Sequence, residues 1–538
     1  MDIDLYQKIR ENRMVLVRDL IRRSAANKPQ NVAYLCGQRR ASFSEMDVRS
    51  DKAALALAKL GLKPGQATGI LAPESIEVYE HFYACFKMGA IRTGLNRRFS
   101  SSELLHVVKD AGVKMILAHA DCEGLLASVA EELSGLGVKL IGYGGEHSLS
   151  YDYESLLSEA IGAFSLPQIA PDSAAMYTYT SGTTGNPKGV VISDRAVRTV
   201  IEGAPANFGF TSDDIFYCPL GNAWAAVVAN LLGLCNGMTT AIPDKEYETK
   251  RFIEEVDELQ VTIFLLAPTM LQWLMDALDE SPSDMSCVRL VMYGSAPASP
   301  KLIETVSKRL QCGLLQAYGV SETCAGWITS LSPHDHVRGL HEKPALLQSA
   351  GQVPSYFDIS IRDDDGHEVA QGEIGEVWVR SEAVMNGYLN LPEQTEEVLK
   401  AGGWLLTNDM GMQDEEGYLY LKDRRKFMIV SGGINVFPAH VEAVMSSHAS
   451  IGEIAVVGAP HRVWGEAVVA VVYPRPGFEG VTQAELLAYC KDKLGKVMMP
   501  KYVHMVQAPL PKSVNLKIQK HIIRDWFKDD PTLLPESF

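Results

Sequence analysis

The sequence predicts an α/β protein: a large N-terminal domain of two doubly wound α/β subdomains plus a small β-subdomain, followed by a small α+β C-terminal domain. Strand-like apolar runs alternate with helix-like runs, and the alternation starts again after a loop of small and hydroxylated residues near position 180. From residue 350 the pattern changes to short alternating strands separated by glycine turns. At 538 residues, the chain is also too long for one hydrophobic core.

The first alternation lies between residues 15 and 145. Strand-like runs are Asn31–Cys36, Thr68–Leu71, Lys114–Ala118 and Val138–Gly142, and helix-like runs are Phe43–Leu60, Ile76–Met88, Leu104–Ala111 and Glu123–Leu136. Alternation at this spacing is typical of a parallel sheet with helices on both faces. Ser100 and Glu103 have the spacing of a capping box, which predicts a helix start. We interpret this region as scaffold.

The second alternation follows the loop. Helix-like runs are Ala196–Ile201, Trp224–Leu234, Phe252–Leu259 and Met270–Leu278, and strand-like runs are Ile215–Cys218, Thr240–Ile242, Thr262–Leu266 and Val288–Tyr293. The segments Gly294–Pro297 and Gln316–Thr323 are expected at strand ends, where ligands bind in open α/β sheets. The small β-subdomain then has the strand-like runs Phe357–Ile361 and Glu376–Arg380.

The loop between the two alternations has the composition of a polyphosphate-binding loop. It reads Tyr-Thr-Ser-Gly-Thr-Thr-Gly-Asn-Pro-Lys-Gly-Val over residues 179–190. Small residues let backbone N–H groups approach anionic oxygens, hydroxyl groups donate further hydrogen bonds, and Lys188 adds a positive charge. It is not a Walker A loop, because Pro187 replaces that motif's second glycine and Gly189 its magnesium-binding Ser or Thr. A plain surface turn has a similar composition, but the lysine and the motifs below favour phosphate binding.

Composition and charge narrow the function class. With 46% hydrophobic and 22% charged residues, the chain has the composition of a globular protein, and no apolar run reaches the length of a membrane span. A formal net charge of -16 argues against nucleic acid as a partner. The acidic N-terminus lacks the apolar core of a signal peptide. The nine cysteines form no Cys-x-x-Cys pair, which argues against a zinc site. We therefore expect a cytoplasmic protein, for which a homodimer is left open.

Five motifs beyond the loop resemble those of the adenylate-forming superfamily, which contains acyl-CoA synthetases, amino-acid-adenylating domains and beetle luciferases. In chain order they are Tyr318–Glu322; Thr407–Asp409 before Gly411 and Gly417–Tyr418; Asp423–Lys426 before Ser431–Gly433; Val436–Pro438 with Glu442; and Pro511–Ser513 leading to Lys517. One such motif would be weak support, but five in the family's order extend over almost the whole chain. The resemblance implies Mg²⁺, ATP and CoA as cofactors or cosubstrates, and a small carboxylic acid as substrate.

The resemblance also implies a nucleotide site. Tyr318 would offer an aromatic face to the purine, and Gly319 would keep the backbone close to it. Glu322 resembles the family's magnesium ligand, a hard carboxylate suited to an ion that bridges phosphates. By itself, Ser-Glu after a glycine is more often the start of a helix. The residues assigned to ATP or AMP are Thr180, Ser181, Gly182, Thr183, Thr184, Gly185, Lys188, Gly294, Ser295, Ala296, Gln316, Ala317, Tyr318, Gly319, Ser321 at the α-phosphate, Asp409, Arg424 and Lys517.

Asp409 resembles the acid that accepts both ribose hydroxyl groups, and a turn aspartate is the alternative. Asn408 replaces the glycine that the family usually has before this acid, so the backbone there is less permissive. Lys517 resembles the catalytic lysine that bridges the carboxylate and the ATP phosphate, where a cation aligns two anions and stabilises the transition state. Leu516 stands in place of the family's usual glycine, and a solvated surface lysine is the alternative for Lys517. Together with Glu322 and Lys188, Lys517 completes the expected catalytic set.

The basic run Lys422–Lys426 is by itself typical of a solvated surface. By resemblance, Arg424 contacts the nucleotide and Lys426 is the hinge of a mobile C-terminal domain. This hinge divides the chain into an AMP-binding domain at 1–425 and a C-terminal domain at 426–538. Gly432 and Gly433 match the loop that approaches the pantetheine arm of CoA.

The acyl pocket is expected along Gly221–Leu234. Family members commonly read Pro-Leu-Phe-His ahead of the pocket helix, whereas here Pro219-Leu220 is followed directly by Gly221, so the Phe-His pair is missing. Asn222, Trp224 and Val228 are assigned to the pocket. Trp224 resembles the aromatic gate of fatty acyl-CoA synthetases, and a core tryptophan is an equally good interpretation.

These features predict an ATP-dependent acid:CoA ligase that forms an acyl-adenylate and then a thioester. The apolar pocket segment favours an aliphatic or aromatic monocarboxylic acid, because a charged tail would lose solvation. One alternative is an enzyme that adenylates an amino acid for a free-standing carrier protein; its α-amino group would need a buried carboxylate, and residues 223–234 contain no acid. The other is a nucleotide-binding protein that has lost catalysis, against which Lys517, Glu322 and Asp409 argue.

Overall fold

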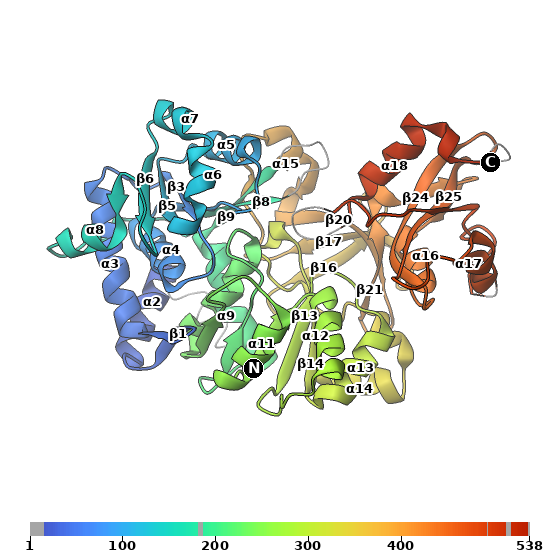
Figure 1. The fold of residues 1–538 in the computed structure, drawn as a ribbon, viewed down its shortest axis with the longest axis horizontal. Helices are drawn as coiled ribbons and strands as arrows, with labels where there is room; N and C mark the ends of the chain where they lie inside the picture. Colours follow the sequence, from blue (N-terminus) through green and yellow to red (C-terminus); the bar gives the residue numbers. More distant parts are fainter. Residues whose placement is uncertain (1–14, 181–186, 492, 513–517, 536–538) are drawn as a thin grey trace. The chain divides into compact units, whose positions relative to one another are not determined.

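The computed structural model describes residues 15–180, 187–491, 493–512 and 518–535. The chain divides into two compact units, one with Met1–Ile359 and Val379–Leu405, the other with Ser360–Trp378 and Leu406–Phe538. Figure 1 labels the helices and strands of both units. Mainly parallel sheets with helices in the first unit, and a smaller α+β second unit, confirm the predicted fold class. The domain boundary at residue 425 stays a prediction.

The first unit contains two eight-stranded sheets. In one of them the strand order is β18-β9-β8-β4-β3-β5-β6-β7. Its strands are β3 (Ala67–Leu71), β4 (Ile91–Gly94), β5 (Met115–His119), β6 (Lys139–Tyr143), β7 (Tyr151–Asp152), β8 (Ala174–Thr180), β9 (Lys188–Ser193) and β18 (Gly387–Tyr388). Neighbours from β8 to β7 are parallel, whereas β9 is antiparallel to both β8 and β18. This sheet therefore places β18 next to the strand that carries Lys188.

The other sheet has the order β15-β14-β13-β12-β10-β11-β1-β2. Its strands are β1 (Val32–Cys36), β2 (Arg39–Ser42), β10 (Ile215–Tyr217), β11 (Thr239–Ile242), β12 (Ile263–Leu266), β13 (Leu290–Gly294), β14 (Gly313–Tyr318) and β15 (Thr329–Leu331). Only the outer strands β2 and β15 pair antiparallel. The run Asn31–Cys36 is a strand as predicted, but its placement with the first alternation was wrong, because β1 pairs with β11.

Helix α4 (Ile76–Met88) is buried along its whole length, because it contacts β4 of one sheet and β1 of the other. Before it come α2 (Val17–Asn27) and α3 (Phe43–Lys59). Helix α5 (Ser101–Asp110) starts with the predicted capping box, in which Ser100 and Glu103 exchange hydrogen bonds. The predicted helix Glu123–Leu136 is instead two short helices, α6 (Glu123–Ala127) and α7 (Ala130–Gly135). They are separated at Ser128, whose hydroxyl donates to the Leu125 carbonyl, and at Val129, whose dihedral angles are not helical.

Three later helices of the first unit overlap predicted helix-like runs: α9 (Asp194–Phe208), α11 (Thr249–Glu258) and α12 (Pro268–Glu280). Four were not predicted: α8 (Tyr153–Glu159), α13 (Pro300–Leu310), α14 (Pro333–His341) and α15 (Pro392–Val398). Helix α10 spans Gly233–Asn236. The predicted helix Trp224–Leu234 is wrong: a 3₁₀ helix spans Ala225–Leu231, Trp224 precedes it in an extended conformation, and α10 follows. Among the described residues, no helix is both long and apolar enough to cross a membrane.

The second unit has two groups of strands. Strands β16 (Asp358–Arg362), β17 (Gly375–Arg380), β19 (Leu399–Lys400), β20 (Trp404–Gln413) and β21 (Leu419–Arg424) belong to one five-stranded sheet, part of which lies in the first unit. The other sheet contains β22 (Ile429–Ser431), β23 (Ile434–Val436), β24 (Ile451–His461), β25 (Gly465–Pro474) and β26 (Tyr502–Met505). The predicted β-runs near residues 357 and 376 are therefore strands.

The C-terminal sheet is covered by helices on both faces. Successive residues of its long strands point to opposite faces, so each strand contributes apolar side chains to two cores. Val456 and Val468 pack in one core with α16 (Pro438–Met445) and α17 (Gln483–Cys490). Val457 and Val469 pack in a second core with α18 (Lys520–Asp529).

Further 3₁₀ helices lie at Ala120–Cys122, Ser321–Thr323, Pro344–Gln348, Ala401–Gly403, Arg425–Phe427 and Pro531–Leu533.

Candidate functional site

The C-terminal ends of β13 and β14 bring two predicted nucleotide-binding segments together. Gly294 ends β13 and pairs with Ala317 of the parallel strand β14. A Cβ atom at Gly294 would lie 2.4 Å from the Ala317 carbonyl oxygen, and one at Gly319 would lie 2.3 Å from the Gly326 carbonyl oxygen. Close backbone contact therefore requires glycine at both positions. Next to them Ser295 has a φ of 64° and is exposed, as is Ala296, while Gln316 and Tyr318 are half-buried.

The predicted phosphate loop starts and ends on paired strands. Thr180 is the last residue of β8 and is opposite Lys188, the first residue of β9. Two contacts fasten this hairpin to α5: the Tyr179 hydroxyl donates to Asp110 at 2.7 Å, and His106 Nε2 lies 3.1 Å from the Pro187 carbonyl oxygen. The strand pair is thus held in place on both sides of the loop. The predicted residues Ser181, Gly182, Thr183, Thr184 and Gly185 lie outside the described residues.

A tyrosine that the sequence analysis did not single out joins Glu322 and Lys188. The Tyr388 hydroxyl donates a hydrogen bond to Glu322 Oε1 at 2.8 Å. The Lys188 ammonium nitrogen lies 5.7 Å from the centre of the same ring, within the range of a cation–π contact. The Met385 N–H donates to the Glu322 carbonyl oxygen at 2.8 Å, which fixes the backbone of the 3₁₀ helix that begins at Ser321. Two predicted catalytic residues therefore share one aromatic partner.

The surroundings of Glu322 fit the binding of Mg²⁺ together with a nucleotide. Its Oε1 atom accepts the Tyr388 hydrogen bond, and Oε2 accepts no hydrogen bond from any described residue. Magnesium in phosphate-transfer sites is usually held by one or two carboxylates together with substrate phosphates. One half-buried carboxylate near the predicted phosphate loop matches this pattern, so Glu322 is the residue that would hold the ion.

Asp409 and Arg424 face each other on neighbouring strands of the second unit. They are cross-strand partners in β20 and β21, and Arg424 Nε lies 3.1 Å from Asp409 Oδ1. Asp409 is only 7% exposed, and its N–H donates to the Thr407 hydroxyl at 3.1 Å. Asn408 has a φ of 61°, in the left-handed region that favours glycine. Asparagine tolerates this region better than most residues, so Asn408 keeps the backbone shape that glycine would give.

Gly432 and Gly433 form the turn between β22 and β23. Their φ values are 60° and 81°, and Ser431 pairs with Ile434 across the turn. A two-residue hairpin of this kind needs positive φ at both central positions, which explains the two glycines. Lys426 is exposed in the 3₁₀ helix that precedes β22, with its ammonium nitrogen 4.9 Å from the Phe427 ring centre.

Residues 21–389 match the family model of AMP-binding enzymes, and residues 440–517 match that of the AMP-binding enzyme C-terminal domain. The first match alone covers more than half of the chain. The protein belongs to the AMP-binding enzyme family. The resemblance to adenylate-forming enzymes is therefore confirmed.

Individual AMP-binding enzymes align with nearly the whole chain. The medium/long-chain-fatty-acid–CoA ligase FadD8 of Mycobacterium tuberculosis is 33% identical over 93% of this chain and 88% of its own. The fatty acid–[acyl-carrier-protein] ligase ScoC of Streptomyces coeruleorubidus is 29% identical over 94% and 95%. The structure of the amide bond synthetase McbA of Marinactinospora thermotolerans has a TM-score of 0.84, with 28% identity over 95% of this chain and all of that chain. By their names, these relatives differ in the acceptor of the acyl group.

The expected acyl-pocket segment of this AMP-binding enzyme is well anchored. Asn222 is buried, and its side-chain amide donates to the Ala72 carbonyl at 3.0 Å. The backbone carbonyl of Asn222 accepts a hydrogen bond from the buried Arg92 side chain at 2.7 Å. Val228 is fully buried and Trp224 is half-buried. The segment is thus fixed against the first sheet through Asn222.

A buried acid lies near this segment, although residues 223–234 contain none. Glu74 accepts a hydrogen bond from the Tyr79 hydroxyl at 2.6 Å, and that hydroxyl accepts one from the Asn230 side chain at 2.7 Å. The acid is far away in the sequence, so inspection of the pocket segment alone missed it. Burial raises the pKa of Glu74, while the hydrogen bond from Tyr79 and the charge of Arg92 act in the opposite direction.

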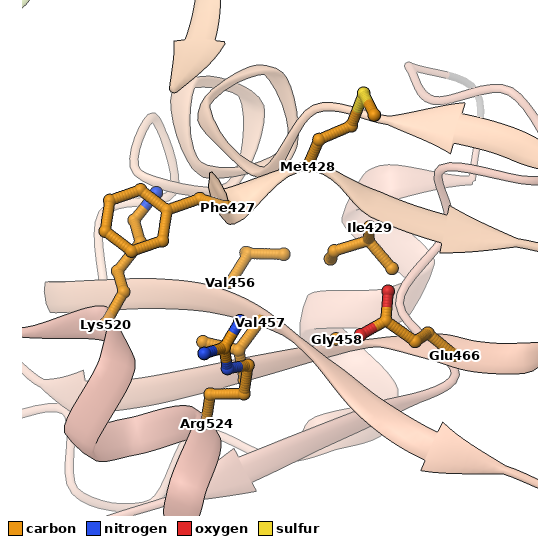
Figure 2. Close-up of a pocket in the computed structure, with 9 residues that line it drawn as sticks. All are labelled: Phe427, Met428, Ile429, Val456, Val457, Gly458, Glu466, Lys520 and Arg524. Carbon is orange, nitrogen blue, oxygen red and sulfur yellow. The ribbon is translucent and has the colours of Figure 1, made fainter. Parts of the chain in front are cut away.

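The second unit contains a small pocket next to α18 (Figure 2). Its lining residues are Phe427, Met428, Ile429, Val456, Val457, Gly458, Glu466, Lys520 and Arg524. Lys520 lies 2.9 Å from the Glu442 carboxylate and 3.8 Å from Asp423, and its nitrogen is 5.5 Å from the Phe427 ring centre. None of the described residues that were predicted to bind ATP or CoA lines this pocket. Lys520 instead joins the start of α18 to α16 and β21, and Lys517 lies outside the described residues.

Proposed function

We propose that this AMP-binding enzyme is an ATP-dependent carboxylic acid:CoA ligase. In the first half-reaction a carboxylate oxygen attacks the α-phosphorus of ATP, and pyrophosphate leaves. In the second, the CoA thiol attacks the acyl carbon, and AMP leaves. The observation that carries the proposal is the contact of Tyr388 with both Glu322 and Lys188, which gathers a carboxylate and a cation at one place within the matched family domain.

The proposed roles follow the chemistry of each side chain. Lys188 neutralises phosphate charge. Tyr318 offers its ring to the base, at the strand ends where Gly294 and Gly319 allow close backbone contact. Asp409 accepts the ribose hydroxyl groups, and Arg424, which already pairs with it, is adjacent to the nucleotide. When bound, Mg²⁺ would supply positive charge that offsets the charge of the phosphates. Glu322 would hold that ion, and Lys517 would bring its ammonium group to the carboxylate and the α-phosphate.

The proposal extends to the second half-reaction and to the domains. Gly432 and Gly433 form the turn that approaches the pantetheine arm, where a side chain would take up space. Lys426 is the proposed hinge between an AMP-binding domain at 1–425 and a C-terminal domain at 426–538. The cytoplasmic location and the homodimer stay predictions.

For the substrate we propose an aliphatic or aromatic monocarboxylic acid. The segment Gly221–Leu234 has Asn222 and Asn230 as its only polar side chains, and both are hydrogen-bonded within the protein. FadD8 and ScoC, two of the relatives, are named for fatty acids.

A pyrophosphate-exchange assay over a panel of acids tests this function. We expect exchange with monocarboxylic acids, and kcat/KM rising about fourfold per added methylene until the pocket is full, because each buried methylene contributes about 0.8 kcal/mol. If Trp224 lines the pocket, Trp224→Ala should move the optimum to longer acids. Trp273→Ala, which removes an exposed indole on α12, should leave it unchanged. An amino acid or dicarboxylate as best substrate would contradict the proposed substrate class.

The acceptor is tested separately, because the relative ScoC is named for an acyl carrier protein. The enzyme, ATP and the best acid are incubated with CoA, with a phosphopantetheinylated carrier protein, or with a primary amine. We expect the acyl thioester of CoA and AMP in equal amounts. Faster transfer to the carrier protein or to the amine would replace CoA in the proposal and leave the adenylation step intact.

A further inference from the structure

The backbone of Tyr388 is held in place by hydrogen bonds to two neighbouring segments. It pairs with Val190 of β9, and its N–H donates to the Thr395 hydroxyl at 2.9 Å. The following residue, Leu389, donates its N–H to the Gly189 carbonyl at 2.8 Å. Because these bonds fix the main chain next to the start of β9, neither the hydroxyl nor the ring is needed to anchor the strand. The contacts of the side chain with Glu322 and Lys188 therefore come in addition to the bonds that anchor the strand.

We propose that Tyr388 is a positioning residue for the adenylation step, which orients Glu322 for Mg²⁺ through its hydroxyl and Lys188 for phosphate through its ring. This inference rests on the proposed function. It assigns two separate tasks to one side chain. The hydroxyl acts on the metal-binding carboxylate, and the ring acts on the ammonium group.

The hydroxyl task follows from the geometry at Glu322. A carboxylate can rotate and can present either oxygen to a cation. The hydrogen bond of 2.8 Å to Oε1 selects one rotation and leaves Oε2 for the ion. Partners that orient a metal ligand in this way typically change metal affinity or activity by 10–100-fold when they are removed.

The ring task follows from the length of the lysine side chain. Lysine loses considerable rotamer freedom when it is ordered, so an ammonium group that is already directed lowers the cost of binding phosphate. The Lys188 nitrogen lies 5.7 Å from the Tyr388 ring centre, and the backbone of Lys188 is fixed as the first residue of β9. Phenylalanine would keep this contact, whereas leucine would remove it.

Two variants separate the tasks. Tyr388→Phe removes the hydroxyl and keeps the ring, and Tyr388→Leu removes both. Tyr153→Phe is the matched control, because the buried Tyr153 also donates to a glutamate, Glu80 at 3.1 Å, in the same unit and away from the predicted site. Circular dichroism and the thermal midpoint show whether each variant folds like the wild type.

Calorimetric titration of the full-length protein with ATP, in the presence and absence of Mg²⁺, gives a result that does not depend on turnover. For Tyr388→Phe we expect Mg²⁺ to strengthen ATP binding about tenfold less than in the wild type, with metal-free ATP binding unchanged. For Tyr388→Leu we expect the same loss together with weaker metal-free binding. Tyr153→Phe should match the wild type in both titrations.

Pyrophosphate exchange with the same variants then gives kcat and KM for ATP. We expect Tyr388→Phe to need about tenfold more Mg²⁺ for half-maximal exchange, and excess Mg²⁺ to restore its kcat. A folded Tyr388→Phe variant with the wild-type response to Mg²⁺ in both experiments would overturn the inference. If the wild type binds Mg-ATP but shows no acid-dependent exchange, the proposed function fails, and the calorimetric comparison still tests Tyr388.

Discussion

His336 supports the strand that ends at Gly294. Its ring is buried at 2% exposure, with Nδ1 2.8 Å from the Ser332 carbonyl oxygen and Nε2 2.7 Å from the Tyr293 hydroxyl. A carbonyl oxygen can only accept, so Nδ1 carries the proton and Nε2 accepts from Tyr293. Burial lowers the pKa of His336 to about 4, although the Ser332 carbonyl and Asp335 act in the opposite direction.

This lowered pKa makes stability depend on pH. The unfolded chain takes up a proton near pH 6.5 and the folded chain only near pH 4, so the free energy of unfolding falls as the pH falls through this window. Between pH 7.5 and 5 the loss from His336 is about 2 kcal/mol. His336→Gln should remove that part of the pH dependence, measured as urea midpoints at the two pH values. His334→Gln, at an exposed neighbour, should not, and equal pH dependence in wild type and His336→Gln would contradict the assignment.

Single residues show what the sequence could and could not predict about the site. Asn408 departs visibly from the family motif, and the structure places it in the left-handed conformation that a glycine would adopt. Tyr388 could not be predicted, because its partners Glu322 and Lys188 are 66 and 200 positions away, and only the pairing of β18 with β9 brings them together. Glu74 was missed for the same reason. The sequence shows the chemical type of each side chain, but it does not show which distant residues that side chain contacts.

The hairpin of β22 and β23 is the element that the proposal assigns to the thioester step. Gly433 has a φ of 81°, and a Cβ atom added there would have nothing within 4 Å, so its backbone angle, and not crowding, requires glycine. Gly477, in the same unit, has a φ of 88° and equally open space. The two glycines therefore form a pair that is matched in backbone angle and in open space.

Gly433→Ala and Gly477→Ala should each destabilise the second unit by about 1–2 kcal/mol, because alanine is strained at positive φ. Only Gly433→Ala should slow the transfer of a supplied acyl-adenylate to CoA, by tenfold or more, while pyrophosphate exchange stays at the wild-type rate. Quenched-flow measurement of thioester formation tests this. Equal transfer rates in the two variants would remove the hairpin from the CoA site.

Elements were predictable where the local pattern decides them. Helix α4 has the predicted bounds Ile76–Met88, since a buried apolar run ends in a glycine cap. The segment at Trp224 was expected to be an α-helix and is a 3₁₀ helix, and β1 was grouped with the wrong sheet. Both errors have one cause. Packing with distant strands decides which conformation an apolar segment adopts and which strand it pairs with.

For the protein as a whole, the proposed function assigns the two half-reactions to two arrangements of the C-terminal residues. Lys517 is proposed to act in the first and the hairpin at Gly432 in the second. Rotation at Lys426 would have to break contacts around Asp423, which accepts the Ala439 N–H at 2.8 Å and lies 3.8 Å from Lys520. Both contacts are polar, so water can replace them when they break.

The proposed acyl-adenylate, which connects the two half-reactions, is tested by following oxygen. The full-length protein is given Mg-ATP, CoA and the best acid of the exchange panel with ¹⁸O in both carboxylate oxygens, and the products are analysed by mass spectrometry. Because one carboxylate oxygen forms the bond to the α-phosphorus and stays there when the thiol displaces AMP, we expect AMP with one ¹⁸O, a thioester that keeps the other, and unlabelled pyrophosphate. Unlabelled AMP, or ADP with labelled phosphate, would contradict an acyl-adenylate.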